Sequence, residues 1–121
     1  MHTKHLKLGK IGENRAVDFL IEKNYQIIDR NWKFNKYEID IIAIDNRELV
    51  IIEVKTRINS LQNTREIISK SQQKRIISAA DSFIKENKID LDVRFDMILI
   101  EKIIKSYKFT HIKEIFYPTF D

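Results

Sequence analysis

Two acidic residues and a lysine occupy neighbouring segments whose spacing suits metal chemistry: Asp40, Glu53 and Lys55. The segments, residues 37–44 and 48–57, are rich in β-branched residues and predict two strands joined by a short turn. In a hairpin with a two-residue turn, Asp40 lies directly opposite Glu53, and the Cβ atoms of such pairs are about 4.5–5.5 Å apart. Facing carboxylates repel each other, and hard divalent cations prefer carboxylate oxygens. The spacing therefore predicts a Mg²⁺ or Mn²⁺ site between the two strands.

The lysine extends this pattern, because residues two apart in a strand point to the same face. Lys55 is therefore predicted beside Glu53, about 7 Å along the strand. An amine in that place can hold a water molecule or offset the charge of a reacting phosphate next to a metal ion. The same face also carries Ile42 and Ile51. The charged trio thus interrupts an apolar surface, which is costly unless it serves a function.

Two predicted helices bring further polar side chains to this face. Apolar residues recur at helical spacing through residues 6–23 and 67–87. Glu13 shares the inward stripe of the first helix, and Gln73 shares that of the second. Together with the trio, they would gather five polar side chains from four elements, a pattern typical of an active site.

The remaining segments complete a mixed α/β pattern. The other predicted elements are a strand at residues 25–32, a turn at 31–36, a polar loop at 58–66, a strand at 93–103, and a strand or short helix at 107–116. The order of helix, three strands, helix and strand predicts a mixed β-sheet flanked by helices. A length of 121 residues fits one domain spanning the whole sequence, 1–121.

The composition restricts the function classes. There are no cysteines, which excludes a disulfide framework and a thiolate zinc site. The N-terminal residues lack the apolar stretch of a signal peptide, and no apolar run approaches the ~20 residues of a membrane span. A cytoplasmic protein without membrane contact is therefore expected. The net charge of +4 and the pI of about 9.3 favour a polyanionic partner such as nucleic acid, although charge alone is weak support.

Five short motifs follow one another along nearly the whole chain. They are KIGENRA at 10–16, RNW at 30–32, EIDIIA at 38–43, EVKTR at 53–57 and RFD at 94–96. Their order and spacing resemble the bacterial YraN family. That family is similar to Holliday-junction resolvases and to other restriction-endonuclease-like proteins with a PD-(D/E)XK motif. A lone Glu-X-Lys is common by chance, whereas the ordered set is specific.

The resemblance implies a restriction-endonuclease-like fold with a nuclease site that binds Mg²⁺ or Mn²⁺. Asp40 then corresponds to the metal-binding aspartate, Glu53 to the second acidic ligand, and Lys55 to the lysine of the motif. Glu13 corresponds to a helix-borne glutamate of the resolvase-like branch and completes the metal shell. Gln73 resembles a glutamine that some branches place near the site.

Two positions depart from the family pattern. Tyr37 stands where the family commonly has a glycine, directly before the EID sequence. Gln72 stands where a lysine usually precedes the helix glutamine. The first change leaves less room for a backbone approach, and the second removes a phosphate contact. Both bear on substrate binding and leave the acidic ligands intact.

Three functions remain open on these residues. The first is a metal-dependent endonuclease that acts on DNA, branched structures included. The second is a non-catalytic nucleic-acid-binding protein that keeps the nuclease fold, which Tyr37 and Gln72 favour. The third is a carboxylate-pair hydrolase such as a glycosidase, against which the shortage of aromatic residues near the motif argues. A homodimer is left open, since resolvase-like enzymes are often dimers.

Four basic residues are candidates for contacts with a nucleic-acid backbone: Arg57, Lys70, Lys74 and Arg75. Arg57 continues the strand face of Glu53, and the other three cluster on the outer side of the second helix. For each of them a solvated charged surface is the alternative.

Overall fold

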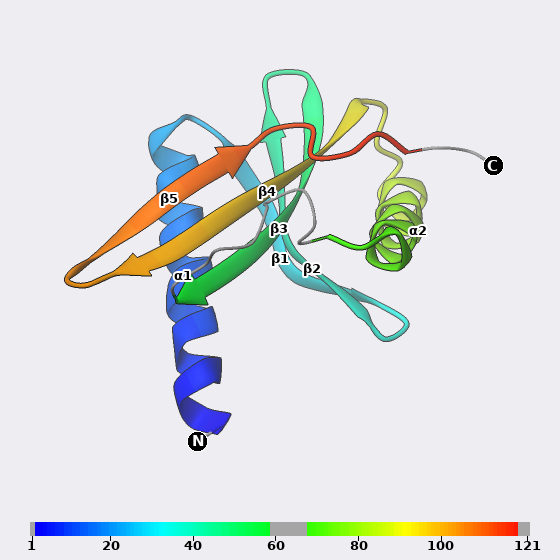
Figure 1. Ribbon diagram of the computed structural model, residues 1–121. Helices are drawn as coiled ribbons and strands as arrows, with labels where there is room; N and C mark the ends of the chain where they lie inside the picture. The colour runs from blue at the N-terminus through cyan, green and yellow to red at the C-terminus, as the bar shows by residue number, and fades with distance from the viewer. Residues whose placement is uncertain (1, 59–67, 119–121) are drawn as a thin grey trace.

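Five strands and two helices build the part of the chain that the structure describes. This computed structural model describes residues 2–58 and 68–118 (Figure 1). The elements, in chain order, are α1 (His2–Glu22), β1 (Gln26–Phe34), β2 (Tyr37–Asp45), β3 (Glu48–Ile58), α2 (Lys70–Glu86), β4 (Asp92–Ile103) and β5 (Ser106–Ile112). The predicted mixed α/β fold, a sheet flanked by helices, is confirmed.

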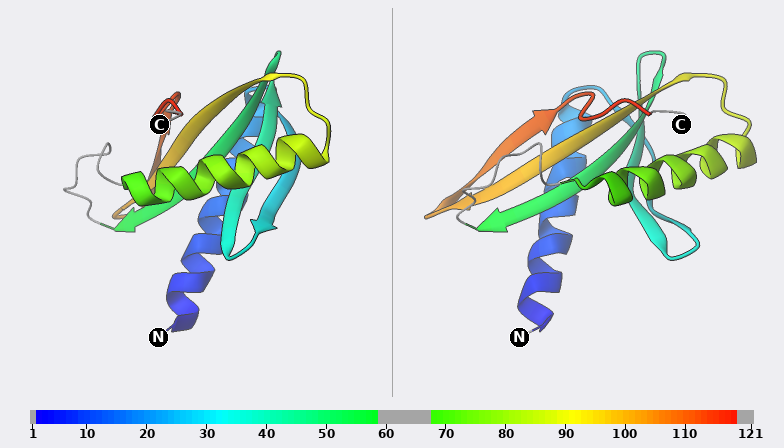
Figure 2. Two further views of the ribbon diagram at one scale, coloured as in Figure 1. Left: turned by 90° about the vertical axis from the view of Figure 1, so that its right-hand side faces the viewer. Right: turned by 45° about the vertical axis from the view of Figure 1, so that its right-hand side comes forward.

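The strands form one mixed sheet in the order β1-β2-β3-β4-β5. Neighbouring strands are antiparallel except β3 and β4, which are parallel. A parallel pair needs a crossover, because a tight hairpin can only join antiparallel strands. Helix α2 lies in that crossover and covers one face of the sheet, while α1 packs on the other face (Figure 1 and Figure 2).

The two faces of the central strands belong to two separate hydrophobic cores. Ile51 of β3 packs under α2 with Phe83, whereas its neighbour Ile52 lies in the core under α1 with Leu20. Ile42 of β2 joins Ile51, as the strand alternation predicts. Because both faces are covered, these strands are apolar along most of their length. Polar residues in them therefore mark positions where the packing is interrupted.

The turn predicted at residues 31–36 is shorter than expected. Strand β1 continues to Phe34, so that the turn begins at Asn35. Asn31 adopts a φ of 53°, a left-handed conformation that asparagine tolerates better than most residues. The ladder to β2 continues beyond it. The polar sequence suggested a turn, but the pairing with β2 keeps this segment in the sheet.

The start of α2 and the character of the last segment also differ from the sequence prediction. Helix α2 begins at Lys70 rather than at residue 67, because Ser69 caps it and its Oγ accepts a hydrogen bond from the Gln72 N–H at 3.1 Å. Strand β5 settles the open choice for residues 107–116 in favour of a strand. The loop predicted at 58–66 falls almost wholly outside the described residues. Within the described ranges, neither helix is long and apolar enough to cross a membrane.

Candidate functional site

The β2–β3 hairpin carries the predicted acidic pair in the predicted register. The last backbone pair of its ladder joins Ile41 to Ile52, and the next step along both strands is Asp40 and Glu53. There the Asp40 carboxylate binds the neighbouring strand, since its Oδ2 accepts a hydrogen bond from the Val54 N–H at 2.7 Å. The two acidic side chains therefore lie at the point where the regular ladder ends.

Strand β2 changes its facing at Asp40. Ile39 and Ile42 both pack in the core under α2, although they are three positions apart, whereas Ile41 packs in the core under α1. Strict alternation cannot hold across such a segment. Asn31, with its left-handed φ, lies opposite Asp40 in β1, between the residues that pair with Ile41 and Ile39. The local irregularity turns the Asp40 side chain toward β3.

Glu53 is held by three polar side chains. Its carboxylate has a side-chain exposure of 12%, and Nζ of Lys55 lies 3.4 Å from Oε1. The Tyr37 hydroxyl donates to Oε2 at 3.1 Å, and the amide of Gln72 donates to Oε1 at 3.1 Å. The predicted proximity of Lys55 and Glu53 is thus present as an ion pair. Tyr37 and Gln72, which depart from the family pattern, are its further partners.

Burial raises the pKa of both carboxylates of this pair. Burial, and next the charge of Glu53, raise the pKa of Asp40 to about 7, although the Val54 hydrogen bond opposes the shift. Burial also raises the pKa of Glu53, against the lowering effects of Lys55 and its hydrogen bonds. The single positive charge of Lys55 therefore does not neutralise the carboxylates of both Asp40 and Glu53. A proton or a further cation is favoured beside Asp40.

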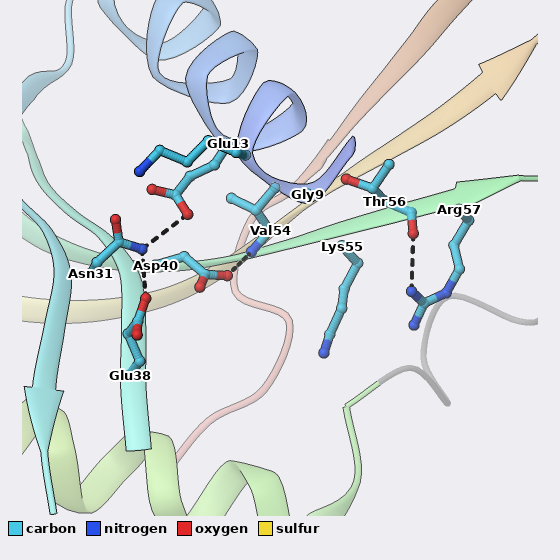
Figure 3. Close-up of a pocket in the computed structure, with 10 residues that line it drawn as sticks. Gly9, Glu13, Asn31, Glu38, Asp40, Val54, Lys55, Thr56 and Arg57 are labelled. Carbon is cyan, nitrogen blue, oxygen red and sulfur yellow. Dashed lines mark hydrogen bonds between the residues drawn. The ribbon is translucent and has the colours of Figure 1, made fainter. Parts of the chain in front are cut away.

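Helix α1 contributes a third acidic residue from the opposite face of the sheet. Glu13 is 9% exposed and accepts hydrogen bonds from Arg30 Nη2 and Asn31 Nδ2, both at 3.0 Å. Nδ2 of Asn31 also donates to Oε1 of Glu38 at 2.6 Å. Figure 3 shows Asn31 between these two carboxylates and Asp40 beside them, reaching Val54. The inward position predicted for Glu13 is confirmed, but the prediction that it shares the face of Ile42 and Ile51 is wrong, because α1 and α2 pack on opposite faces of the sheet.

A glycine allows α1 to come this close to β3. A Cβ atom at Gly12 would lie 2.5 Å from Oγ1 of Thr56, a distance that real Cβ atoms do not adopt. Because Glu13 follows directly in the helix, this close approach sets how far its carboxylate reaches toward the sheet. The packing of α1 and the position of Glu13 are therefore one structural feature.

An open pocket of about 430 Å³ joins Asp40 and Glu13 to basic side chains (Figure 3). Its lining consists of Gly9, Lys10, Glu13, Asn31, Glu38, Asp40, Val54, Lys55, Thr56 and Arg57. Glu53 instead borders a narrow apolar space under α2. Among the described residues, no three His, Cys, Asp or Glu side chains are already grouped as a metal site. Of the three predicted ligands, Asp40 and Glu13 thus line one pocket, whereas Glu53 borders another space, and the three do not form a closed ligand set.

The glutamine on α2 that reaches the acidic pair is not the expected one. Gln73 donates to the Ile68 carbonyl at 3.3 Å, whereas Gln72 contacts Glu53. The prediction placed Gln73 on the inward stripe, but the Ser69 cap fixes the first turn so that Gln72 faces the sheet. Sequence reasoning therefore missed Gln72 and Tyr37 as partners of Glu53. The only signal was that each directly adjoins a segment predicted to form the site.

The predicted nucleic-acid contacts fall into two places. Arg57 lines the pocket beside Asp40 and Lys55, and its guanidinium donates to the Thr56 carbonyl at 3.1 Å. Three others, Lys70, Lys74 and Arg75, are exposed on α2. Of the four predicted contacts, the structure therefore brings only Arg57 close to the carboxylates of the pocket.

Comparison with known proteins identifies a family that spans the whole site. Residues 12–100 match the family described as Uncharacterised protein family UPF0102. The chain belongs to the UPF0102 family. All residues proposed above as ligands or phosphate contacts lie within the UPF0102 match. This agrees with the YraN-like resemblance of the sequence motifs.

Relatives in the UPF0102 family cover nearly the whole chain. A UPF0102 protein of Bacteroides thetaiotaomicron is 45% identical over 117 residues, which are 96% of this chain and 97% of that protein. A UPF0102 protein of Clostridium botulinum is 44% identical over 113 residues, 90% of this chain and 93% of that protein. One from Flavobacterium psychrophilum is 38% identical over 116 residues, 95% of this chain and 98% of that protein.

Proposed function

We propose that this UPF0102 chain is a metal-dependent endonuclease of the PD-(D/E)XK type that hydrolyses phosphodiester bonds in DNA, branched structures included. The observation that carries the proposal is the buried pair of Asp40 and Glu53, with the amine of Lys55 3.4 Å from Glu53. Burial, and next the charge of Glu53, raise the pKa of Asp40, and a divalent cation at this place would favour the charged carboxylate.

The donor set suits a hard cation. Mg²⁺ and Mn²⁺ prefer oxygen ligands, and Asp40, Glu53 and Glu13 supply only carboxylate oxygens. The Val54 N–H donates a hydrogen bond to Oδ2 of Asp40. Within the described residues, Oδ1 of Asp40 accepts no hydrogen bond. We therefore assign Asp40 and Glu53 as ligands, with Glu13 completing the shell. When bound, the ion would polarise a phosphate and make a bound water more acidic.

The surrounding side chains have separate tasks in this proposal. Lys55 orients the attacking water and offsets negative charge that develops on the phosphate. Arg30 and Asn31 fix the carboxylate of Glu13, since each donates to it at 3.0 Å. Arg57, at the rim of the pocket, is placed to hold a neighbouring phosphate of the strand.

A second function has a specific observation in its favour. Both oxygens of Glu53 already accept hydrogen bonds, one from Tyr37 and one from Gln72. If these contacts persist, Glu53 cannot turn toward Asp40 to share an ion. The chain would then be a nucleic-acid-binding protein that keeps the nuclease architecture without turnover.

Cleavage and metal binding separate the two functions. Linear, flapped and four-way DNA substrates are incubated with Mg²⁺ or Mn²⁺ and the wild-type protein, Asp40→Asn, Lys55→Met or the exposed control Asp90→Asn. We expect cleavage by wild type and control, and a loss of about 100-fold or more in the other two. Mn²⁺ titration by calorimetry should show binding that Asp40→Asn abolishes. DNA binding without cleavage under either metal would establish the second function instead.

A further inference from the structure

A second hollow lies between the β1–β2 turn and α2. It measures about 750 Å³, within the range of roughly 300–1,000 Å³ that is usual for ligand sites. Its lining consists of Phe34, Asn35, Lys36, Tyr37, Lys74, Arg75 and Ser78. Both views of Figure 2 place the β1–β2 turn beside α2. We call this hollow the turn–helix groove.

The charge of the turn–helix groove is entirely positive. Lys36 comes from the turn, and Lys74 and Arg75 come from α2, while none of the described residues that line the groove is acidic. The adjoining hollow farther along α2 is different, because Asp81 and Glu86 line it. That hollow also contains Lys85, so its charge is mixed, whereas the lining of the turn–helix groove is only basic. Such a patch suits the phosphates of a polyanion.

Two aromatic rings, those of Phe34 and Tyr37, also line the groove. Phe34 stacks on Trp32 with the ring planes 1° apart and the centroids at 6.4 Å, and Trp32 packs edge-on against Phe83 in the core. Tyr37 is held by its hydroxyl bond to Glu53. Both rings that line the groove are thus fixed before any ligand arrives. Aromatic side chains stack on bases whose faces are free, as in unpaired strands, whereas paired bases stay stacked within a duplex.

Tyr37 connects the turn–helix groove to the acidic pair. Its ring lines the groove, and its hydroxyl donates to Oε2 of Glu53 at 3.1 Å. Beyond Glu53, the amine of Lys55 lies 3.4 Å away and lines the open pocket together with Arg57. Tyr37 thus joins the turn–helix groove to Glu53, and the ion pair of Glu53 with Lys55 joins Glu53 to the open pocket.

We propose that the turn–helix groove binds unpaired nucleotides and leads them into the candidate site, so that the substrate is DNA with a single-stranded segment. The inference rests on the proposed function, because it names the substrate of that same site. Lys36 and Lys74 contact phosphates, and Phe34 and Tyr37 stack on bases.

Fluorescence anisotropy with a short labelled oligothymidylate tests the phosphate contacts. Binding is measured in EDTA and again with Ca²⁺ across a salt series, beside a duplex of equal length. We expect tighter binding of the single strand by wild type. The double variant Lys36→Ala/Lys74→Ala should weaken it and reduce the slope of log affinity against log salt by about 1.4, since each lost contact to a single strand removes about 0.7. The exposed control Lys105→Ala should match wild type.

A second pair of variants tests the rings. Phe34→Leu keeps an apolar side chain and should weaken oligothymidylate binding about fivefold or more through lost stacking. Tyr37→Leu removes the second ring and should weaken binding in the same way, whereas the control Tyr117→Leu, at an exposed position outside the groove, should bind the strand as wild type does. Thermal melting verifies that each variant is folded. If Phe34→Leu does not fold, the double variant Lys36→Ala/Lys74→Ala, which changes only exposed residues, still tests the proposal.

The results distinguish this inference from the nuclease proposal. Equal affinity for duplex and single strand, an unchanged salt slope in the lysine variant, or no binding by wild type under either condition overturns the role of the turn–helix groove. Cleavage that is indifferent to these variants overturns it as well, while leaving the nuclease standing. Strand binding in the groove without any cleavage sustains the inference as a binding site and removes only the nuclease.

Discussion

The carboxylate of Asp40 determines how the candidate site responds to pH. In the unfolded chain this group has an ordinary pKa of 3.8, and burial together with the charge of Glu53 raises it to about 7 in the folded protein. Between these values the folded state holds a proton that the unfolded state has released. The free energy of unfolding therefore falls as the pH rises through this range.

Replacing Asp40 by asparagine should remove this penalty. The amide oxygen can still accept the Val54 hydrogen bond, but it carries no charge to repel Glu53. We expect Asp40→Asn to be more stable than the metal-free wild type by about 2 kcal/mol near pH 8, and by much less near pH 4–5. Urea unfolding in EDTA at several pH values measures the difference. A gap that is constant with pH would show that Asp40 is not charged in the way described.

For single residues, the sequence predicted the positions of those that follow the regular spacing of a strand. The period of two and a short turn were enough to pair Asp40 with Glu53 and to set Lys55 beside them, and the structure has that register and that ion pair. The contacts of Tyr37 and Gln72 with Glu53 could not be predicted. They depend on where α2 begins and on the change of facing at Asp40, and neither follows from an ideal periodic pattern.

Among the elements, α1 and β3 pack so closely that their contact leaves no room for a larger side chain at Gly12. The helix approaches the strand at Gly12, where a Cβ atom would meet Oγ1 of Thr56 at 2.5 Å and Cδ1 of Ile100 at 3.3 Å. Gly9, one turn earlier, has open space around it. Two glycines in one helix thus have opposite structural roles. Only Gly12 is required by the packing.

Alanine substitutions at the two glycines should have opposite effects. Gly12→Ala forces α1 away from β3, and we expect it to destabilise the protein by about 1–3 kcal/mol. Gly9→Ala meets nothing and should stabilise by up to about 1 kcal/mol through helix propensity. Both are measured by urea unfolding. In a double-mutant cycle, Thr56→Ala should restore most of the loss in Gly12→Ala, and independent, additive effects would contradict the proposed contact.

The elements were predictable where their apolar pattern was strong and less so at their ends. The hairpin of β2 and β3 and both helices follow from periodicity, because buried faces impose it. The end of β1 and the start of α2 were misplaced by a few residues. Pairing with β2 carries β1 past the polar Asn31 to Phe34, and the Ser69 cap sets the start of α2. Such local effects leave the hydrophobic pattern unchanged.

Across the whole molecule, a buried ionic network around Arg94 and Asp96 ties distant strands together. Arg94 of β4 donates to both oxygens of Asp96 at 2.9 and 3.0 Å and to the hydroxyl of Tyr25 at 2.7 Å. The same guanidinium reaches Asp45 at 3.2 Å, beside the β2–β3 turn. Nε2 of His111 in β5 lies 2.7 Å from Asp96. Arg94 and Asp96 are two positions apart in one strand and therefore share a face, whereas His111 reaches Asp96 only through the pairing of β4 with β5.

The two buried aspartates make opposite contributions to stability as the pH changes. Burial alone would raise the pKa of Asp96, but hydrogen bonds from His111 and Arg94 outweigh it and lower the pKa below its ordinary value. The contribution of Asp96 is therefore complete above the unfolded value and is lost as the pH falls through the folded one. Asp40 penalises the folded state as the pH rises toward 7. The metal-free protein should accordingly be most stable in mildly acidic solution.

Asp96→Asn should reveal the acid side of this balance. The variant leaves Arg94 buried without its closest anionic partner, and we expect a loss of roughly 3–5 kcal/mol in the free energy of unfolding near neutral pH. Because protonation removes the same charge from wild type, the gap between the two proteins should close as the pH falls below about 4. Urea unfolding from neutral to acid pH measures it, with the exposed Asp90→Asn as the control that should follow wild type throughout. A gap that stays open in acid would mean that Asp96 stabilises the fold through packing and not through its charge.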